Sequence, residues 1–215
     1  MRFERKYRIE GVSLAQVRQV VDAHPLGFRT HYPDRQVNNI YLDTPDLEYF
    51  RLNLIGTGER RKYRIRWYGK DPLTARSPLL EIKIKHNELG EKQIFTLSDQ
   101  TSLDQASVDT WIHQEVRNHG ALIPVLLNRY DRSYLISYDG KYRLTLDRTM
   151  RFASMEYPAG GNPATLPELV DEAVVMEIKY DLAHDQEFKR ISWHFPFRVG
   201  KNSKYVNGVL MTGMI

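Results

Sequence analysis

Five segments of this sequence alternate charged and apolar residues with a period of two. In residues 79–85 the even positions are leucine and isoleucine, whereas Glu81, Lys83 and Lys85 occupy odd positions. Because successive side chains of a β-strand point to opposite faces, this pattern predicts a strand with one apolar and one charged face. The same alternation occurs at residues 2–9, 60–68, 142–148 and 174–181. The fold therefore has to bury one face of each strand and accommodate cations on the other.

The charged faces contain more arginine and lysine than carboxylates. A carboxylate with a lysine two positions later occurs at Glu4, Glu81 and Glu177. One explanation is a half-exposed sheet whose cross-strand ion pairs contribute only a few tenths to about 1 kcal/mol each. Five such faces favour a different explanation, because ordinary exposed faces mix threonine, serine and glutamine with lysine. If the sheet closes and its apolar faces pack under helices, the charged faces form a cationic lumen for a densely anionic ligand.

Periodicity also predicts three helices among the strands. One begins at Ser13, with Gln16 at the capping-box position, and ends before Pro25. A second covers about residues 104–118, and the apolar spacing of residues 188–195 indicates a third. Further strands are expected at residues 37–43, 93–97 and 127–136, and the proline- and glycine-rich residues 155–169 are expected to form an irregular, mobile excursion.

Together these elements predict an α+β fold over residues 1–215 as a single domain. Its centre is expected to be an eight-stranded antiparallel closed β-barrel with a cationic lumen and a few helices packed outside, since closure removes the exposed sheet edges. The 215 residues contain no cysteine, which excludes disulfide frameworks, zinc ribbons and thiol nucleophiles. The net charge of only +4 makes the position of the cations more informative than their number.

Two stretches bear on where the protein is located. The first ten residues are rich in charge, which leaves no apolar core for a signal peptide, and residues 206–215 are too few to span a bilayer. We therefore expect a cytoplasmic protein without a membrane segment.

The seven histidines show no metal-binding spacing. Carboxylates enclosed among cations are costly unless they bind a divalent cation, and Mg²⁺ or Mn²⁺ prefers oxygen ligands shared with substrate phosphates.

Seven short motifs, taken in order, resemble those of a known family. They are Glu4-Arg5-Lys6-Tyr7, Arg64-Ile65-Arg66, Leu80-Glu81-Ile82-Lys83, Tyr130-Asp131-Arg132, Arg143-Leu144-Thr145-Leu146-Asp147, Met176-Glu177-Ile178-Lys179-Tyr180 and Ser203-Lys204-Tyr205. The set resembles the catalytic domain of the vacuolar transporter chaperone (VTC) polyphosphate polymerases, in the triphosphate tunnel metalloenzyme (CYTH-like) superfamily. Arg2 stands where the adenylate-cyclase and thiamine-triphosphatase branch has its first glutamate, which favours the VTC branch.

This resemblance implies a tunnel that binds a triphosphate or polyphosphate with Mn²⁺ or Mg²⁺. Its catalytic residues would be Lys6, Arg64, Arg66 and Glu177, with Glu177 and Glu4 as the metal ligands. The residues expected to bind substrate come from the same motifs and charged faces, apart from Lys201, which lies just before the last motif: Lys83, Lys85, Tyr130, Arg132, Arg143, Lys179, Lys201 and Lys204.

The expected activity is metal-dependent transfer of the terminal phosphoryl group of ATP, or another nucleoside triphosphate, onto a growing inorganic polyphosphate chain. An inorganic or organic triphosphatase using the same site is the first alternative. A non-catalytic module that binds polyphosphate or RNA is the second. Glu177 with Glu4 favours metal chemistry over pure binding. Nucleic acid is not the expected partner, because the aromatic residues fall mainly on the apolar strand faces.

Overall fold

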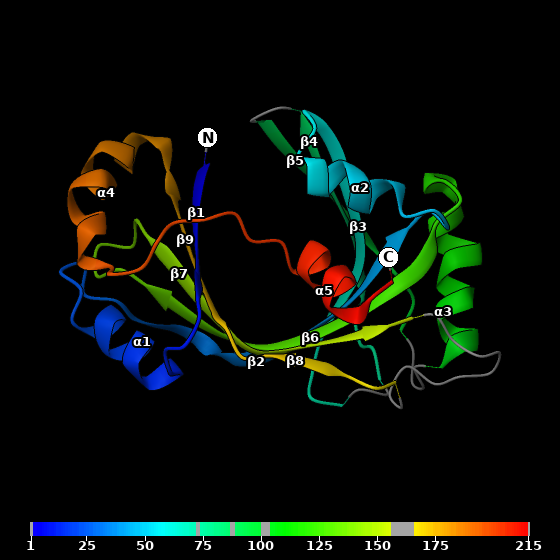
Figure 1. The fold of residues 1–215 in the computed structure, drawn as a ribbon, viewed down its shortest axis with the longest axis horizontal. Coiled ribbons are helices and arrows are strands. Elements are labelled where there is room, and N and C mark those ends of the chain that lie inside the picture. Colours follow the sequence, from blue (N-terminus) through cyan, green and yellow to red (C-terminus); the bar gives the residue numbers. More distant parts are fainter. Residues whose placement is uncertain (1, 72–73, 87–88, 100–103, 156–165, 215) are drawn as a thin grey trace. The chain divides into compact units, whose positions relative to one another are not determined.

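The computed structural model describes residues 2–71, 74–86, 89–99, 104–155 and 166–214. Within these ranges the chain forms β-strands, several of them consecutive, with helices between some of them (Figure 1). The strands are β1 (Arg2–Ile9), β2 (Arg29–Asp43), β3 (Glu59–Tyr68), β4 (Leu79–His86), β5 (Leu89–Thr96), β6 (Ile123–Ile136), β7 (Arg143–Ser154), β8 (Leu169–Asp171) and β9 (Val174–Asp181). The α-helices are α1 (Leu14–Asp22), α2 (Glu48–Ile55), α3 (Gln105–Trp111), α4 (Asp185–Ile191) and α5 (Lys204–Thr212).

The strands pair in the order β1-β9-β7-β6-β2-β3-β4-β5, and β8 pairs with β7. The registers of β1 with β9, β9 with β7, and β2 through β5 are antiparallel. These pairings confirm an α+β fold with an antiparallel sheet. In the part of the chain that the structure describes, β1 and β5 are the two ends of the pairing order, so closure into a barrel stays a prediction.

The chain divides into two compact units. The first contains Met1–Arg35, Tyr130–Met150 and Asp171–Asn202, and the second contains Gln36–Arg129, Arg151–Val170 and Ser203–Ile215. In the first unit, α1 and α4 lie beside β1, β7 and β9 (Figure 1). Val17 and Val21 of α1 and Phe188 of α4 share one apolar cluster with Ile178 and its neighbours on the strands. The capping box predicted at Ser13 is present.

In the second unit, the apolar face of β3 and β4 packs against α3. Ile65 and Ile82 are buried in a cluster that includes Trp67 of β3 and Trp111 of α3, whose ring centroids are 6.5 Å apart. This burial confirms the strand parity predicted from the sequence. No helix among the described residues is long and apolar enough to cross a membrane.

Two helices and one strand were not predicted: α2, α5 and β8. Helix α2 follows Leu47, which adopts a left-handed backbone conformation with φ of 58°. Its eight residues show only a weak separation of apolar and polar faces. The position of the helix therefore depends on hydrogen bonds that other residues make to its first turn. Helix α5 packs closely through Gly208, because a Cβ there would lie 2.5 Å from Phe152 Cδ1. Strand β2 begins at Arg29, eight residues before the predicted start.

The other predicted elements differ mainly in their ends. Strand β5 begins at Leu89, whereas residues 93–97 were expected. The helix expected over residues 104–118 begins after its Asp104 cap as α3, continues as a π-helix over Ile112–Val116 and ends in a 3₁₀ turn. The excursion predicted at residues 155–169 lies mostly outside the described residues, since the structure does not describe 156–165.

Candidate functional site

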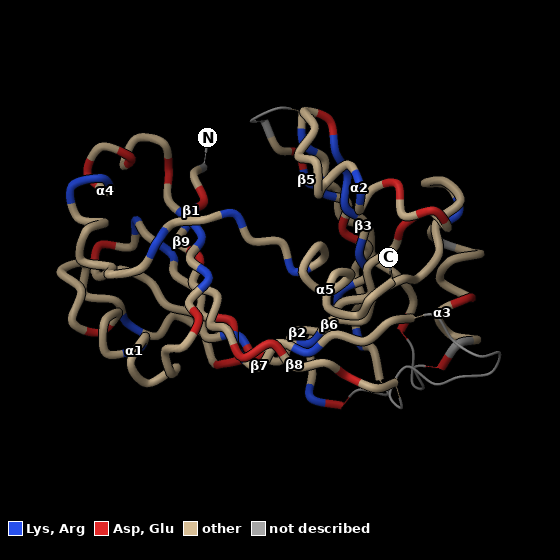
Figure 2. Tube along the Cα trace, in the orientation of Figure 1, with Lys and Arg blue, Asp and Glu red and all other residues tan. Residues whose placement is uncertain are grey.

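In the second unit, cations gather on one face of β3, β4 and β5. Lys62 pairs with Lys83 in the β3–β4 register, and Lys83 pairs with Lys92 in the β4–β5 register. Like charges directly opposite one another destabilise a sheet, so a row of three lysines is better explained by an anionic ligand than by stability. Arg64 and Arg66 continue the same face along β3, and Figure 2 shows the basic residues repeated along this strand.

Glu81 is the carboxylate at the centre of these cations. Its side chain is 5% exposed and pairs with Arg64, with Arg66 at 3.5 Å and with Lys92 at 2.6 Å. Burial raises the pKa of Glu81, but the attraction of Arg64, Arg66 and Lys92 outweighs burial and lowers the pKa from 4.5 to about 2. Glu81 therefore stays ionised at neutral pH and holds the two guanidinium groups in place.

The depressed pKa of Glu81 predicts an acid-labile second unit. Its contribution to stability is complete above the unfolded pKa of 4.5 and is lost as the pH falls toward 2. We expect the free energy of unfolding, measured by urea titration, to fall by up to about 3 kcal/mol across this window. Glu81→Gln should flatten that fall, whereas Glu91→Gln, at an exposed position on β5, should leave it unchanged. An equally steep fall in Glu81→Gln would contradict this assignment.

The polar face of the second unit continues onto β2 and β6 through amide side chains. Arg66 Nε donates to Asn39 Oδ1 at 3.0 Å, and Asn39 Nδ2 donates to Asn128 Oδ1 at 3.4 Å. Asn39 and Asn128 are fully buried, and Arg66 is 8% exposed. This chain of hydrogen bonds fixes the direction of the Arg66 guanidinium.

Helix α5 brings the Ser203-Lys204-Tyr205 motif to the same unit. Ser203 Oγ accepts a hydrogen bond from Lys62 Nζ at 2.7 Å and caps the helix by accepting from Val206 N at 3.3 Å. Lys204 is half-buried at the first position of the helix. The predicted substrate-binding residue Lys204 therefore follows a serine that contacts the cationic face of β3.

In the first unit, two carboxylates and two lysines alternate on β1 and β9. Lys6 Nζ lies 2.7 Å from Glu4 and 3.6 Å from Glu177, and Lys179 Nζ lies 2.6 Å from Glu177 and 3.6 Å from Glu4. Lys6 Nζ also donates to the carbonyl of Asn202 at 3.5 Å. The four predicted residues Glu4, Lys6, Glu177 and Lys179 thus form one network.

Glu177 is the buried member of this network. Its burial raises its pKa, but Lys6, Lys179 and Arg132 outweigh burial and hold the pKa well below its usual range. Thr145 is opposite Glu177 in the β7–β9 register, and its buried Oγ1 has no hydrogen-bond partner among the described residues. A buried hydroxyl without a partner is costly and points to a group that binds there.

Three of the remaining predicted residues of the first unit, Tyr130, Arg132 and Arg143, lie on strands β6 and β7. Arg132 makes a two-atom ion pair with buried Asp147, at 2.5 and 2.7 Å, and stacks over Tyr130 at 5.2 Å from its ring centroid. Arg143 is opposite Lys179 in the β7–β9 register and is exposed. Lys201 is exposed in the segment before α5.

The residues predicted as metal ligands fit a divalent cation that is shared with substrate. Glu4 and Glu177 supply carboxylate oxygens on neighbouring strands, linked by the same two lysines. No group of three histidine or acidic side chains suited to a metal occurs among the described residues. Proteins usually bind Mg²⁺ through one or two carboxylates, and phosphate oxygens of the substrate complete its coordination shell. The donor set therefore fits Mg²⁺ or Mn²⁺ bound together with a phosphate ligand.

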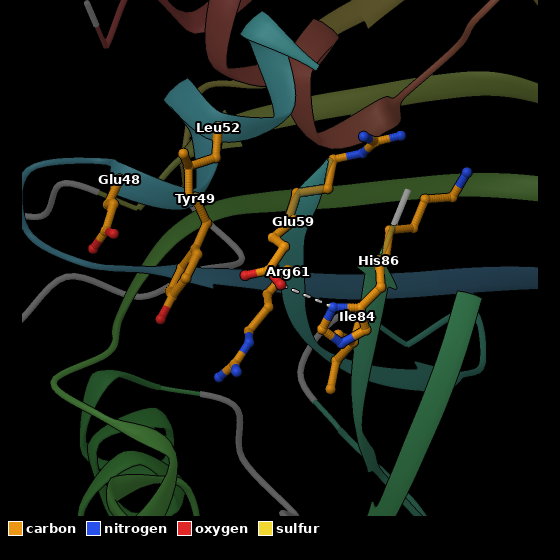
Figure 3. A pocket seen from close by; sticks show the side chains of 9 residues that line it. Glu48, Tyr49, Leu52, Glu59, Arg61, Ile84 and His86 are labelled. Carbon is orange, nitrogen blue, oxygen red and sulfur yellow. Dashed lines mark ion pairs between the residues drawn. The ribbon is translucent and has the colours of Figure 1, made fainter. Parts of the chain in front are cut away.

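A separate hollow of about 240 Å³ lies where α2 meets the ends of β3 and β4 (Figure 3). Tyr49 of α2 and Arg61 of β3 line it, and His86 lies 3.4 Å from Glu59 across its edge. Of the predicted site residues only Lys85 lines this hollow. Arg61 has the parity of the apolar strand face, whereas Arg60 and Lys85, which also line the hollow, have the parity of the cationic face.

The predicted residues therefore form two groups. The first unit contains Glu4, Lys6, Tyr130, Arg132, Arg143, Glu177, Lys179 and Lys201, and the second contains Arg64, Arg66, Lys83, Lys85 and Lys204. Sequence reasoning left Lys62, Glu81 and Lys92 unassigned. Lys62 and Glu81 already fell on the charged strand faces that the alternating pattern predicts, so the sequence could have identified them. Lys92 precedes the predicted start of its strand, and only the pairing with Lys83 reveals its position.

Comparisons with solved structures support the fold. The PH1819 protein of Pyrococcus horikoshii OT3 aligns with a TM-score of 0.53 at 14% identity, covering 99% of this chain and 98% of that chain. A proposed adenylate cyclase of Vibrio parahaemolyticus aligns at 0.52 and 13% identity, covering 96% and 97%. A proposed adenylate cyclase of Bacillus halodurans aligns at 0.53 and 16% identity, covering 94% of each chain. At these identities the likeness shows a shared fold.

No curated protein matches this sequence. The family model of the VTC domain matches residues 1–212, which is nearly the whole chain and includes both units with their charged strand faces. The match agrees with the order of motifs from Glu4 to Tyr205, each of which lies on a strand or at the start of α5. The chain belongs to the VTC domain family.

Proposed function

We propose that this protein is a metal-dependent phosphotransferase that moves the terminal phosphoryl group of a nucleoside triphosphate, ATP being the expected one, onto inorganic polyphosphate. The observation that carries the proposal is the sorting of charge by strand face. Cations with a few buried carboxylates occupy the face opposite the apolar core in both units. The proposal includes one closed tunnel domain over residues 1–215, with both groups of cations facing its lumen.

The reaction needs positioning and charge stabilisation more than covalent help from the protein. An oxygen of the terminal phosphate of the acceptor chain attacks the γ-phosphorus, the bond from that phosphorus to the β–γ bridging oxygen breaks, and the nucleoside diphosphate leaves. Arg64 and Arg66 present guanidinium groups that Glu81 already holds in place, so they bind phosphate oxygens with little reorganisation. When substrate binds, Lys6 and Lys179 would exchange their ion pairs with Glu4 and Glu177 for contacts with phosphate oxygens.

Glu4 and Glu177 would hold the divalent cation. When bound, Mn²⁺ or Mg²⁺ neutralises phosphate charge and orients the β- and γ-phosphates. The ionised state of Glu177 supports this role, since its pKa lies well below the usual range. The hydroxyl of Thr145, which has no hydrogen-bond partner in the described part of the chain, lies opposite Glu177 and supports binding of an oxygen-rich ligand there.

The test is incubation of purified protein with [γ-³²P]ATP and Mn²⁺ or Mg²⁺, with and without a polyphosphate primer. Products are resolved on a gel that separates long chains from free phosphate. We expect labelled chains and ADP, both abolished by EDTA. Labelled free phosphate alone would instead identify a triphosphatase, and cyclic AMP with pyrophosphate would identify a cyclase. Tight polyphosphate binding without turnover would identify a binding module.

A further inference from the structure

One buried carboxylate in the second unit ties two helices to the end of β2. Asp43 is fully buried, and its Oδ1 accepts hydrogen bonds from Thr44 N at 2.7 Å and Tyr49 N at 2.9 Å. Its Oδ2 accepts from Phe50 N at 2.8 Å and from the hydroxyl of Tyr205. Asp43 thus satisfies the N–H groups of Tyr49 and Phe50 in the first turn of α2 and also anchors α5.

Tyr205 meets this carboxylate from the first turn of α5. Its ring stacks on Tyr41 with centroids 5.0 Å apart, and it meets Phe50 edge-on at 6.2 Å. Tyr41 is opposite Arg64 in the β2–β3 register, so the tyrosine stack borders the cationic face. Burial, and next the charge of Asp43, raise the pKa of Tyr205, which keeps the phenol protonated as a hydrogen-bond donor.

The hydroxyl of Tyr205 holds the end of α5 that carries Lys204, the predicted substrate-binding residue. Ser203 and Lys204 immediately precede it, and Ser203 Oγ contacts Lys62 of β3. The middle of the helix is held independently by the close approach of Gly208 to Phe152. Loss of the hydroxyl alone would therefore free the first turn and leave the helix packed.

We propose that Asp43 and Tyr205 form a latch that fixes the first turn of α5, and that Tyr205 is thereby a positioning residue for phosphate binding by Lys204. This role rests on the proposed function, because it assumes that the cationic face binds a triphosphate. The two residues of the motif then have different roles. Lys204 contacts the anion, and Tyr205 fixes the position of Lys204.

The experiment is a double-mutant cycle on the full chain, with inorganic tripolyphosphate as the probe and isothermal titration calorimetry as the measurement. Tyr205→Phe keeps the ring stack on Tyr41 and removes the hydroxyl. We expect it to weaken tripolyphosphate binding about fivefold to tenfold, and Lys204→Ala to weaken binding by at least as much. Because Tyr205 acts through Lys204, the double variant should bind no more weakly than Lys204→Ala alone.

Tyr142→Phe is the matched control. Tyr142 is fully buried and donates its hydroxyl to the carbonyl of His184 at 3.4 Å, among apolar side chains of the first unit. We expect it to lower the melting temperature and leave tripolyphosphate affinity unchanged. Unchanged affinity in Tyr205→Phe, or fully additive losses in the double variant, would overturn the latch while the proposed function stands. A wild-type protein that does not bind tripolyphosphate would overturn both.

Discussion

Glu177→Gln is expected to abolish metal-dependent turnover while the protein still binds polyphosphate. Glutamine keeps the shape of the side chain and removes the charge that pairs with Lys6 and Lys179. A cation shared between carboxylate and phosphate then loses a ligand, so kcat with ATP and Mn²⁺ should fall by about 100-fold or more. Steady-state kinetics across a Mn²⁺ titration measures this loss, and polyphosphate binding in EDTA is measured in parallel.

Turnover should be lost without a loss of metal-free polyphosphate binding. Without the charge of Glu177, both lysines are freer to bind phosphate oxygens, so metal-free polyphosphate binding should persist or improve. Glu187→Gln is the control in the same unit, since that carboxylate is half-exposed and pairs with Lys141 at 3.8 Å, outside the Glu4–Glu177 network. If Glu177→Gln retained wild-type activity at every Mn²⁺ concentration, Glu177 would be removed from the site.

Strand parity was the most informative feature of the sequence. It predicted that Ile65, Ile82 and Ile178 would be buried opposite charged faces, and all three lie in apolar clusters. The argument works because the two faces of a strand are determined by sequence alone, whichever strands pair. The predicted cationic lumen would bring Lys83, Arg66 and Lys179 together. Lys83 and Arg66 share one face of the second unit. Lys179 belongs to the first unit, and its convergence with them stays a prediction.

The features missed by sequence reasoning depend on contacts between segments far apart in the chain. Asp43 looks like an ordinary residue before a Thr-Pro turn, yet its carboxylate accepts bonds from α2 and from Tyr205, 162 residues later. Helix α5 is short and mostly apolar, so the sequence pattern did not distinguish it from an irregular terminus. Lys92 lies outside the predicted strand, and only its pairing with Lys83 assigns it to the cationic face.

The exchange of arginine for lysine on β3 tests whether this face binds phosphate or is only basic. Arg64 engages Glu81 through both Nε and Nη2, and Arg66 bonds Asn39 through Nε while its Nη1 lies 3.5 Å from Glu81. Lysine keeps the charge but has a single nitrogen, so it cannot hold a carboxylate and a phosphate oxygen in one plane. The buried amide of Asn39 would also lose its donor.

We expect Arg64→Lys and Arg66→Lys each to lower kcat/KM for ATP by an amount equivalent to about 1–3 kcal/mol of transition-state stabilisation. Arg18→Lys is the matched control, because Arg18 lies on α1 and makes a partly exposed ion pair with Asp22. A cation that only contributes to surface charge tolerates this exchange, so Arg18→Lys should leave kcat/KM unchanged. If both β3 variants were as silent as Arg18→Lys in steady-state kinetics, the phosphate-binding role of residues 60–68 would have to be abandoned.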